Sequence, residues 1–443
     1  MSPWHKFIWA AAVPCSRILR GVRSPNRRRW AEYDSATSGP SRSGALSPDA
    51  IARPHLPLLS LFWCLLLVAV SSEAQFISRD TRALWANEVF ENYGANGYRD
   101  YDFEEENRRF DIFGDLLIDG DVIKRVGGDI VQAGAEVIDA RGMVVMPGLI
   151  NAHTHSNQSI EKGLCDRLPL DAWMVLASYG GAGARLEPRD LYISAMVGAI
   201  EMLSTGTTSV LDCIRTDFAW FDEGLDAVMQ AYADIGMRAN VAAQYSDLGF
   251  FSSVPLSLIE APEELLIQER RADVGDLLTK LEGYLDRWEG RDPLLTPMLG
   301  PSAVPRCSVE MFEASLQLAR RKGARLQTHL LSGKSQVQVG NDRYEGSTVQ
   351  YLRGLGALEP WASFAHGIWI SDEEIDILAD TDTTIVHNPV SNLKLGAGIA
   401  PVPALIRAGV NVAIGSDGAS SGDSQNMFEA TKSAALLHRI ANP

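Results

Sequence analysis

The pattern of apolar and polar positions divides the chain near residue 143. Beyond it, short apolar runs, typical of buried strands, alternate with segments whose apolar residues recur with the period of an amphipathic helix. The pattern predicts eight strands, at residues 143–155, 209–214, 238–245, 294–302, 325–331, 363–370, 384–388 and 412–417. It predicts helices between them, among others at 191–203, 221–235, 309–322 and 372–379. This alternation is typical of an α/β fold and predicts a (β/α)8 TIM-type barrel over residues 146–443.

The first part of the chain follows other patterns. Residues 108–145 hold short alternating runs punctuated by glycines, which predicts a small β-sheet unit. In residues 1–55 basic residues outnumber acidic ones and Ser, Pro and Gly are frequent, so we expect residues 1–107 to be a largely disordered leader and linker. Residues 56–72 form an uncharged apolar run of marginal length against the ~20 residues of a spanning helix. A leader, or an artefact of gene prediction, is favoured over a membrane anchor.

Each predicted strand of the barrel ends in a polar residue. The residues in question are His155, Asp212, Gln244, Ser302, His329, His366, His387 and Asp417. Barrel enzymes carry their active sites at the carboxyl ends of the strands, so we expect these side chains to meet in one mouth.

Several of these residues have the chemistry of metal ligands. His153 and His155 lie two residues apart on a predicted strand, so their side chains share one face. His329 and His366 offer further imidazoles and Asp417 a carboxylate. Three imidazoles with one carboxylate suit one divalent ion, Zn²⁺ or alternatively Fe²⁺, with a position left for water. Water bound to such an ion has a pKa of about 7. His387 precedes a turn-forming stretch and is less suited to be a ligand, and the fourth predicted strand contains no lysine that could bridge two metals.

Composition narrows the function classes. A net charge of −16 disfavours nucleic acid as a partner, and 46% apolar with 22% charged residues is typical of a globular enzyme. The five cysteines form no Cys-x-x-Cys pair, which argues against a zinc ribbon and the cytidine-deaminase type of zinc site. We expect a small-molecule substrate and a cytoplasmic location, with organelle targeting or membrane anchoring through residues 1–72 as the alternative. The sequence leaves open whether the protein forms a homo-oligomer.

Seven stretches of the chain form a characteristic set. They are residues 139–155, 170–173, 204–208, 328–329, 365–366, 386–395 and 415–418. Together they resemble the amidohydrolase superfamily, in particular the branch of nucleobase and triazine aminohydrolases with the related chlorohydrolases. The resemblance covers roughly residues 111–443. It implies a barrel with a small flanking β-sandwich, which we expect to be incomplete because the chain's first strands and its end depart from the family pattern.

The resemblance also implies roles for individual residues. His153, His155, His329 and Asp417 would hold the metal, and Asp417 would also accept the proton of the attacking water. His366 would orient that water and polarise the electrophile. Gln158 would contact the polar edge of a heterocyclic substrate, with a capping role as the alternative. The implied reaction is hydrolysis of a non-peptide carbon–nitrogen bond by metal-bound hydroxide, most simply deamination of a cyclic amidine or nucleobase-like ring.

Ser332 departs from the family pattern. Aminohydrolases of this branch carry a glutamate three residues after the histidine of the fifth strand, where it transfers protons, and a serine hydroxyl cannot replace it. Loss of a general acid–base group costs about 10²–10⁴ in rate. Glu345 could substitute, although we expect it in a solvated loop. Otherwise the substrate has a leaving group that needs less help, as for a triazine-type chlorohydrolase, or the protein is a catalytically impaired ligand-binding remnant. Ser332 itself is predicted to contact the substrate.

Overall fold

The structure, a computed structural model, describes residues 17–20, 65–68, 114–140, 144–179, 186–255 and 272–441. Most of the predicted leader at 1–107 and the predicted strand near residue 110 lie outside these residues. The chain divides into two compact units, and the larger contains residues 148–443.

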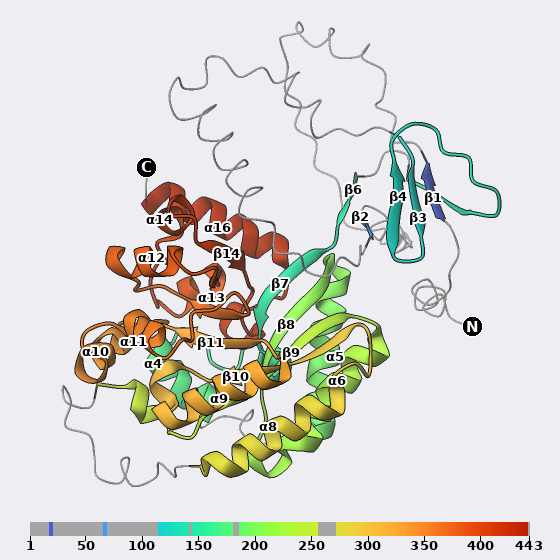
Figure 1. The fold of residues 1–443 in the computed structure, drawn as a ribbon. Coiled ribbons are helices and arrows are strands. Elements are labelled where there is room, and N and C mark those ends of the chain that lie inside the picture. Colours follow the sequence, from blue (N-terminus) through green and yellow to red (C-terminus); the bar gives the residue numbers. More distant parts are fainter. Residues whose placement is uncertain are drawn as a thin grey trace, which may run out of the picture. The chain divides into compact units, whose positions relative to one another are not determined.

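The larger unit is built on one sheet of eight parallel strands that follow one another in sequence order (Figure 1). They are β7 (Leu149–Thr154), β8 (Thr207–Arg215), β9 (Arg238–Tyr245), β10 (Leu295–Pro301), β11 (Leu326–Leu330), β12 (Ala362–His366), β13 (Thr384–His387) and β14 (Asn411–Ile414). The chain after β14 returns to β7, since the backbone N–H of Asp417 donates to the carbonyl of His153 at 3.0 Å. The predicted (β/α)8 barrel is confirmed.

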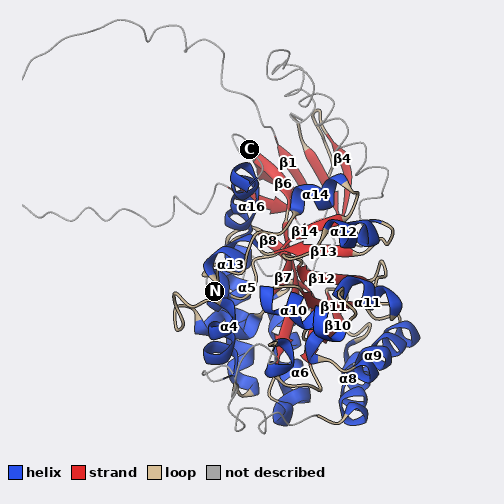
Figure 2. Ribbon diagram, turned by 90° about the vertical axis from the view of Figure 1, so that its left-hand side faces the viewer, coloured by secondary structure: helices blue, strands red, loops and turns tan. Residues whose placement is uncertain are grey.

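Helices lie around the outside of these strands (Figure 2). The main ones are α5 (Pro188–Ser204), α6 (Phe221–Ile235), α8 (Val274–Trp288), α9 (Val309–Lys322), α11 (Thr348–Gly354), α12 (Asp372–Ala379), α14 (Val402–Arg407) and α16 (Met427–Ala441). Local chemistry sets their ends: Ser308 caps the backbone N–H of Met311 at the start of α9, and Gly323 ends that helix in the left-handed conformation. Helix and strand side chains form one large core whose fully buried members include Tyr232, Phe312 and Phe364. Burial of each such side chain contributes roughly 1.5–3 kcal/mol.

The strand predicted over residues 143–155 is in fact two strands. β6 (Val144–Pro147) ends at a proline, and β7 begins after Gly148. A Cβ at Gly148 would lie 1.9 Å from Oγ1 of Thr208, so only glycine fits this close approach. The apolar pattern runs on through the break, which is why it predicted a single strand.

The smaller unit contains two short sheets. The first has the order β4–β3–β1–β5, formed by β1 (Arg17–Arg20), β3 (Leu116–Asp119), β4 (Val122–Val126) and β5 (Glu136–Asp139). β2 (Leu65–Val68) pairs in parallel with β6. The small β-sheet unit predicted over 108–145 is therefore present, and it is joined by two strands from the segment predicted to be a leader.

Short elements follow the barrel strands at their carboxyl ends. They are η3 (Ser156–Glu161), α4 (Leu170–Trp173), η4 (Met174–Tyr179), η9 (Val304–Arg306), α10 (Lys334–Arg343), α13 (Pro389–Lys394) and α15 (Ala419–Gly422). The segment that carries α4 is tied to α13, because Leu170 N–H donates to the Leu395 carbonyl at 3.0 Å and Lys394 lies 3.2 Å from Asp166. Within the described part of the chain, no helix combines the length and the apolar character needed to cross a membrane.

Candidate metal centre and active site

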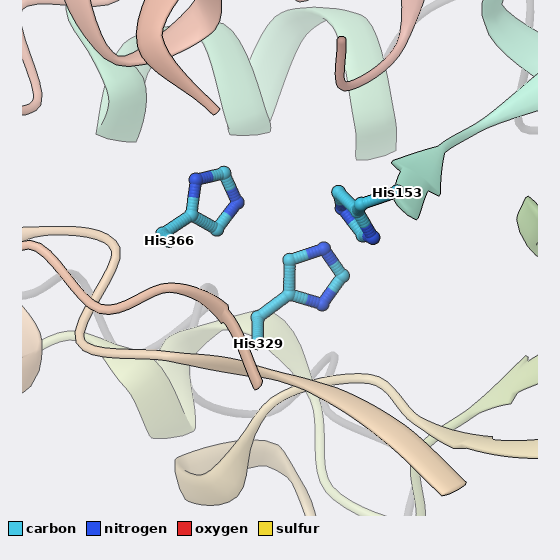
Figure 3. Close-up of side chains that lie close together, drawn as sticks. All are labelled: His153, His329 and His366. Carbon is cyan, nitrogen blue, oxygen red and sulfur yellow. The ribbon is translucent and has the colours of Figure 1, made fainter. Parts of the chain in front are cut away.

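Four histidines and one aspartate converge at the carboxyl ends of the barrel strands. His153 and His155 come from the end of β7, and Figure 3 shows the rings of His153, His329 and His366 around a common space. Oδ1 of Asp417 lies 3.6 Å from Nε2 of His153 and 3.4 Å from Nε2 of His155. The ligand atoms of His153, His155 and Asp417 all lie within 4.8 Å of one another, as do those of His153, His329 and His366. The structure thus brings together every residue predicted for the metal.

Each of the four imidazoles has an oxygen acceptor at its Nδ1. The acceptors for His153 and His366 are side-chain amide oxygens, of Gln327 at 2.7 Å and Asn392 at 2.9 Å. Those for His155 and His329 are the main-chain carbonyls of Cys213, at 2.5 Å, and Ser302. A ring that donates its Nδ1–H to a carbonyl keeps the lone pair on Nε2, which is the tautomer of metal-binding histidines.

The inward nitrogens fit a cation. Nε2 of His155 and Nε2 of His329 lie 3.2 Å apart, so two lone pairs face each other. Nε2 of His153 is buried with no hydrogen-bond partner among the described residues. Buried polar atoms arranged in this way are costly without a partner. A divalent ion between them and the Asp417 carboxylate satisfies all of them, and nitrogen with carboxylate oxygen is a ligand set that Zn²⁺ and Fe²⁺ accept.

The environment fixes the charges of these groups. Burial foremost, together with the neighbouring His155, lowers the pKa of His153 to about 3. Burial alone would raise the pKa of Asp417, but the surrounding imidazoles, His366 foremost, hold it well below its ordinary value. The Ser391 hydroxyl adds to this by donating to Oδ2 at 2.5 Å. Burial foremost also lowers the pKa values of His329 and His366, so these two rings and that of His153 are neutral beside an ionised carboxylate, which is the state that binds a metal.

Two of these residues have unusual backbones. His366 has φ 78° and Asp417 has φ 61°, in a region that side-chain-bearing residues rarely adopt. Such conformations cost about 1–3 kcal/mol each and persist where the surrounding structure enforces them, most often at functional sites. The positive φ of each residue, at the carboxyl end of its strand, directs its side chain into the site.

A pocket opens above the metal ligands. Its lining includes His155, Asn157, Gln158, Asp171, Trp173, Arg215, Gln244, Arg306, His329, Ser332, Ser335, Gln336, His366 and Asp417. Its lining mixes polar side chains with the apolar side chains of Leu170, Met174, Phe250 and Leu395. Such a cavity suits a flat ring with polar edges.

Gln158 lies within η3 and lines the pocket. Its buried Oε1 has no partner among the described residues. A Cβ at Gly418 would lie 1.9 Å from this oxygen, so the glycine leaves room for the side chain.

Ser332 is buried in the pocket wall and held by Gln336. The amide of Gln336 donates to Oγ of Ser332 at 3.0 Å and accepts from its backbone N–H at 3.2 Å. Glu345, considered as a substitute acid, is exposed and does not line the pocket. His387 belongs to neither ligand group, and the centroid of its ring lies 5.4 Å from that of His438.

Several functional residues were missed in the sequence. Gln327 had a signal, because it lies two residues before His329 and so on the same strand face. Asn392 belongs to the turn-forming stretch after His387. Arg215 and Arg306 carried no pattern that would place them in the pocket, whereas Asp171 lies in the characteristic stretch 170–173, to which no role was given.

Comparisons with known proteins agree with this geometry. The profile of the amidohydrolase family matches residues 144–443. The chain is 35% identical to a 5-methylthioadenosine/S-adenosylhomocysteine deaminase of Thermococcus sibiricus, over 74% of this chain and 70% of the relative. It is 33% identical to a 5'-deoxyadenosine deaminase of Methanosarcina acetivorans, over 74% of this chain and 69% of the relative.

Among solved structures, atrazine chlorohydrolase TrzN from Arthrobacter aurescens TC1, crystallised with zinc, is similar with a TM-score of 0.66. It is 28% identical, and the match covers 74% of this chain and 72% of that one. The predicted superfamily is confirmed, together with its two kinds of relative, deaminases and a triazine-type hydrolase. With a profile match over most of the chain and a relative above 30% identity, the chain belongs to the amidohydrolase family.

Proposed function

We propose that this protein is a metal-dependent hydrolase that removes an amino group from a small aminated heterocycle. One observation carries the proposal: the four imidazoles and the Asp417 carboxylate lie close together, and His155, His329, His366 and Asp417 also line one pocket. The deaminase relatives support the reaction class, and the polar pocket lining supports a ring with hydrogen-bonding edges.

In this proposal His153, His155, His329 and Asp417 hold one divalent ion, for which zinc is the first choice and iron the alternative. Such an ion supplies Lewis acidity, which makes water a nucleophile at neutral pH. The TrzN structure with zinc supports this choice.

The chain's own residues complete the chemistry. Asp417 is ionised and lies within 4.0 Å of Nε2 of His366, so it can accept a proton from the attacking water. His366, fixed by Asn392, faces the same space and would stabilise charge that develops at the attacked carbon. Gln158 is placed to donate and accept at the polar edge of the ring, with Gly418 giving it room.

Ser332 supports a second candidate function. Because its hydroxyl is a poor acid, a substrate whose leaving group departs without a proton, such as chloride, would suit the site. The likeness to a chlorohydrolase favours this alternative. A third candidate, a remnant that binds a ring without turning it over, follows from the same residue.

One experiment separates the three candidates. The purified protein is assayed for metal content and then, with zinc or iron, against matched amino- and chloro-substituted purines and triazines. The proposal expects about one ion per chain and release of ammonia. Release of chloride but no ammonia favours the chlorohydrolase. Metal binding without either product, with ammonia release gained in Ser332→Glu, identifies the remnant. Absence of bound metal would contradict the site itself.

A further inference from the structure

The backbone of Asp417 has a strained conformation beyond the end of its strand. β14 ends at Ile414, and Asp417 follows, buried and with φ 61°. Its Oδ1 lies 3.4 Å from Nε2 of His155, whereas its Oδ2 lies 4.0 Å from Nε2 of His366. A left-handed conformation of this kind persists only where neighbouring groups enforce it. The groups that bond to this backbone therefore decide where the two carboxylate oxygens point.

Gln425 holds the carbonyl of Asp417. It lies between α15 and α16, and its Nε2 donates to this carbonyl at 2.9 Å. The hydroxyls of Thr154 and Ser416 also lie 3.0 Å from the carbonyl, but they lie equally close to Oε1 of Gln425, at 2.8 and 2.9 Å. A hydroxyl has one hydrogen, so each of them serves one of these two oxygens at a time. Nε2 of Gln425, by contrast, donates only to the Asp417 carbonyl among the described residues.

The peptide unit between Asp417 and Gly418 transmits this contact to the carboxylate. Its N–H, on Gly418, donates to Oδ1 of Asp417 at 2.8 Å. Because a peptide unit is planar, a carbonyl fixed by Gln425 also fixes the direction of this N–H. The bond from Gln425 therefore sets the orientation of Oδ1, the oxygen that lies beside the inward nitrogens of His153 and His155.

The surroundings of Gln425 make this contact rigid. Gln425, Asn151, Thr154 and Ser416 are each at most 2% exposed. Asn151 joins the group to β7: its Nδ2 donates to Ser416 Oγ at 2.7 Å, and its Oδ1 accepts from the backbone N–H groups of Ser416 at 3.0 Å and His153 at 3.3 Å. A buried polar network whose members are all bonded is rigid, and removal of one member leaves buried groups without a partner.

We propose that Gln425 is a positioning residue for Asp417 and acts on its carboxylate through the peptide unit between Asp417 and Gly418. This role rests on the proposed metal-dependent hydrolysis. Without the Gln425 amide the peptide unit can rotate, and Asp417 can relax from its positive φ, so that Oδ1 moves away from the imidazole nitrogens. A displacement of about 1 Å at a reacting group can cost about 10²-fold in rate. Loss of a group that orients a metal ligand costs about 10–100-fold in metal affinity.

The test compares Gln425→Met with Asn426→Ala. Methionine has a similar volume and flexibility but donates no hydrogen bond. Asn426 is the next residue, and its Oδ1 accepts from the backbone N–H of Phe428 at 3.0 Å at the start of α16. Among the described residues its side chain bonds to Phe428 and not to Asp417, so Asn426→Ala weakens the same segment without changing the contact to Asp417.

In competition with a chromophoric chelator, Gln425→Met should bind zinc about 10–100-fold more weakly than wild type. With zinc at saturation, kcat for ammonia release should fall about 10²-fold, with KM changed less than about threefold. The visible spectrum of the cobalt-loaded protein should change, because it depends on the geometry of the ligands. Asn426→Ala should lower the midpoint of urea unfolding but keep zinc affinity and kcat within about twofold of wild type. Gln425→Asn, whose amide is one carbon shorter and cannot keep the same contacts, should also bind zinc more weakly than wild type.

Three outcomes overturn the role of Gln425. If Gln425→Met keeps zinc affinity and kcat within about threefold of wild type, Gln425 does not position Asp417. If Asn426→Ala loses zinc affinity and kcat to the same extent, the effect belongs to the general stability of the segment. If neither Gln425 variant folds, the carboxamide is a structural group. The proposed function fails by a different result: when zinc affinity falls as expected in Gln425→Met but the metal-loaded wild type releases no ammonia from any ring, the positioning of Asp417 stands and the deamination does not.

Discussion

Gln327→Leu tests whether the tautomer of His153 controls metal binding. Gln327 is fully buried; its Oε1 accepts from His153 Nδ1 at 2.7 Å, and its Nε2 donates to the Ala152 carbonyl and to Ser363 Oγ, each at 3.0 Å. Leucine has a similar volume and makes none of these bonds. The buried His153 N–H and Ala152 carbonyl then lose their partners, at about 1–3 kcal/mol each. The metal-free protein should therefore lose roughly 2–6 kcal/mol of unfolding free energy.

Metal affinity should fall as well. Removing a partner that orients a ligand costs about 10–100-fold in affinity, or about 1.4–2.7 kcal/mol. Competition with a chromophoric chelator measures this constant, and urea unfolding in EDTA measures the stability of the metal-free state. Ser363→Ala is the matched control, since it removes one partner of Gln327 and leaves the bond to His153. Its metal affinity should stay within about threefold of wild type. A Gln327→Leu protein that binds zinc as tightly as wild type would refute the assignment of His153 as an oriented ligand.

Three further predictions follow from the site. His366→Ala should lower kcat by about 10²–10⁴-fold while about one ion per chain remains by metal analysis, and loss of the ion would make His366 a ligand instead. Zinc at about one hundred times its dissociation constant should add about 2.7 kcal/mol to the unfolding free energy, because the facing lone pairs of His155 and His329 gain a shared cation; an unchanged unfolding curve would contradict this. Burial raises the pKa of Glu161 to about 7, with Arg215 acting against it, so the folded state keeps a proton that the unfolded chain releases above its ordinary value of 4.5. Stability should accordingly fall as pH rises from about 4.5 to about 7, and urea unfolding of Glu161→Gln across this range should lack that slope.

The barrel was predictable because its elements follow simple periods. The helices predicted at 221–235 and 309–322 have the bounds of α6 and α9. The sequence of each helix has the regular apolar period of an amphipathic helix and a capping residue at one end, Gly236 after α6 and Ser308 before α9. The strands were predictable as apolar runs, and the polar residues at their ends predicted that the site lies at the carboxyl ends of the strands.

The orientation of the ligands, the segment of α4 and η4, and the pairing of β1 could not be predicted from the sequence. His155 and His329 are oriented by the main-chain carbonyls of Cys213 and Ser302, which any residue there would provide. The segment of α4 and η4 has no clear period, so its helical turns could not be predicted, although residues 170–173 belong to the characteristic stretches. β1 pairs with β3 and β5 although it lies in a basic, polar stretch that resembled a leader. Its partners lie about a hundred residues away, and a local pattern carries no information about them.

The bond from Asp417 N–H to the His153 carbonyl joins the last turn of the barrel to its first strand. The metal ligands thus come from the first barrel strand, β7, and from the residues that follow the last strand, β14, with His329 on β11 between them. A chain in which β14 has not yet docked offers the three histidines but lacks the carboxylate that completes the set. Tight metal uptake becomes a final step of folding, and the metal content of a preparation counts the molecules whose barrel has closed.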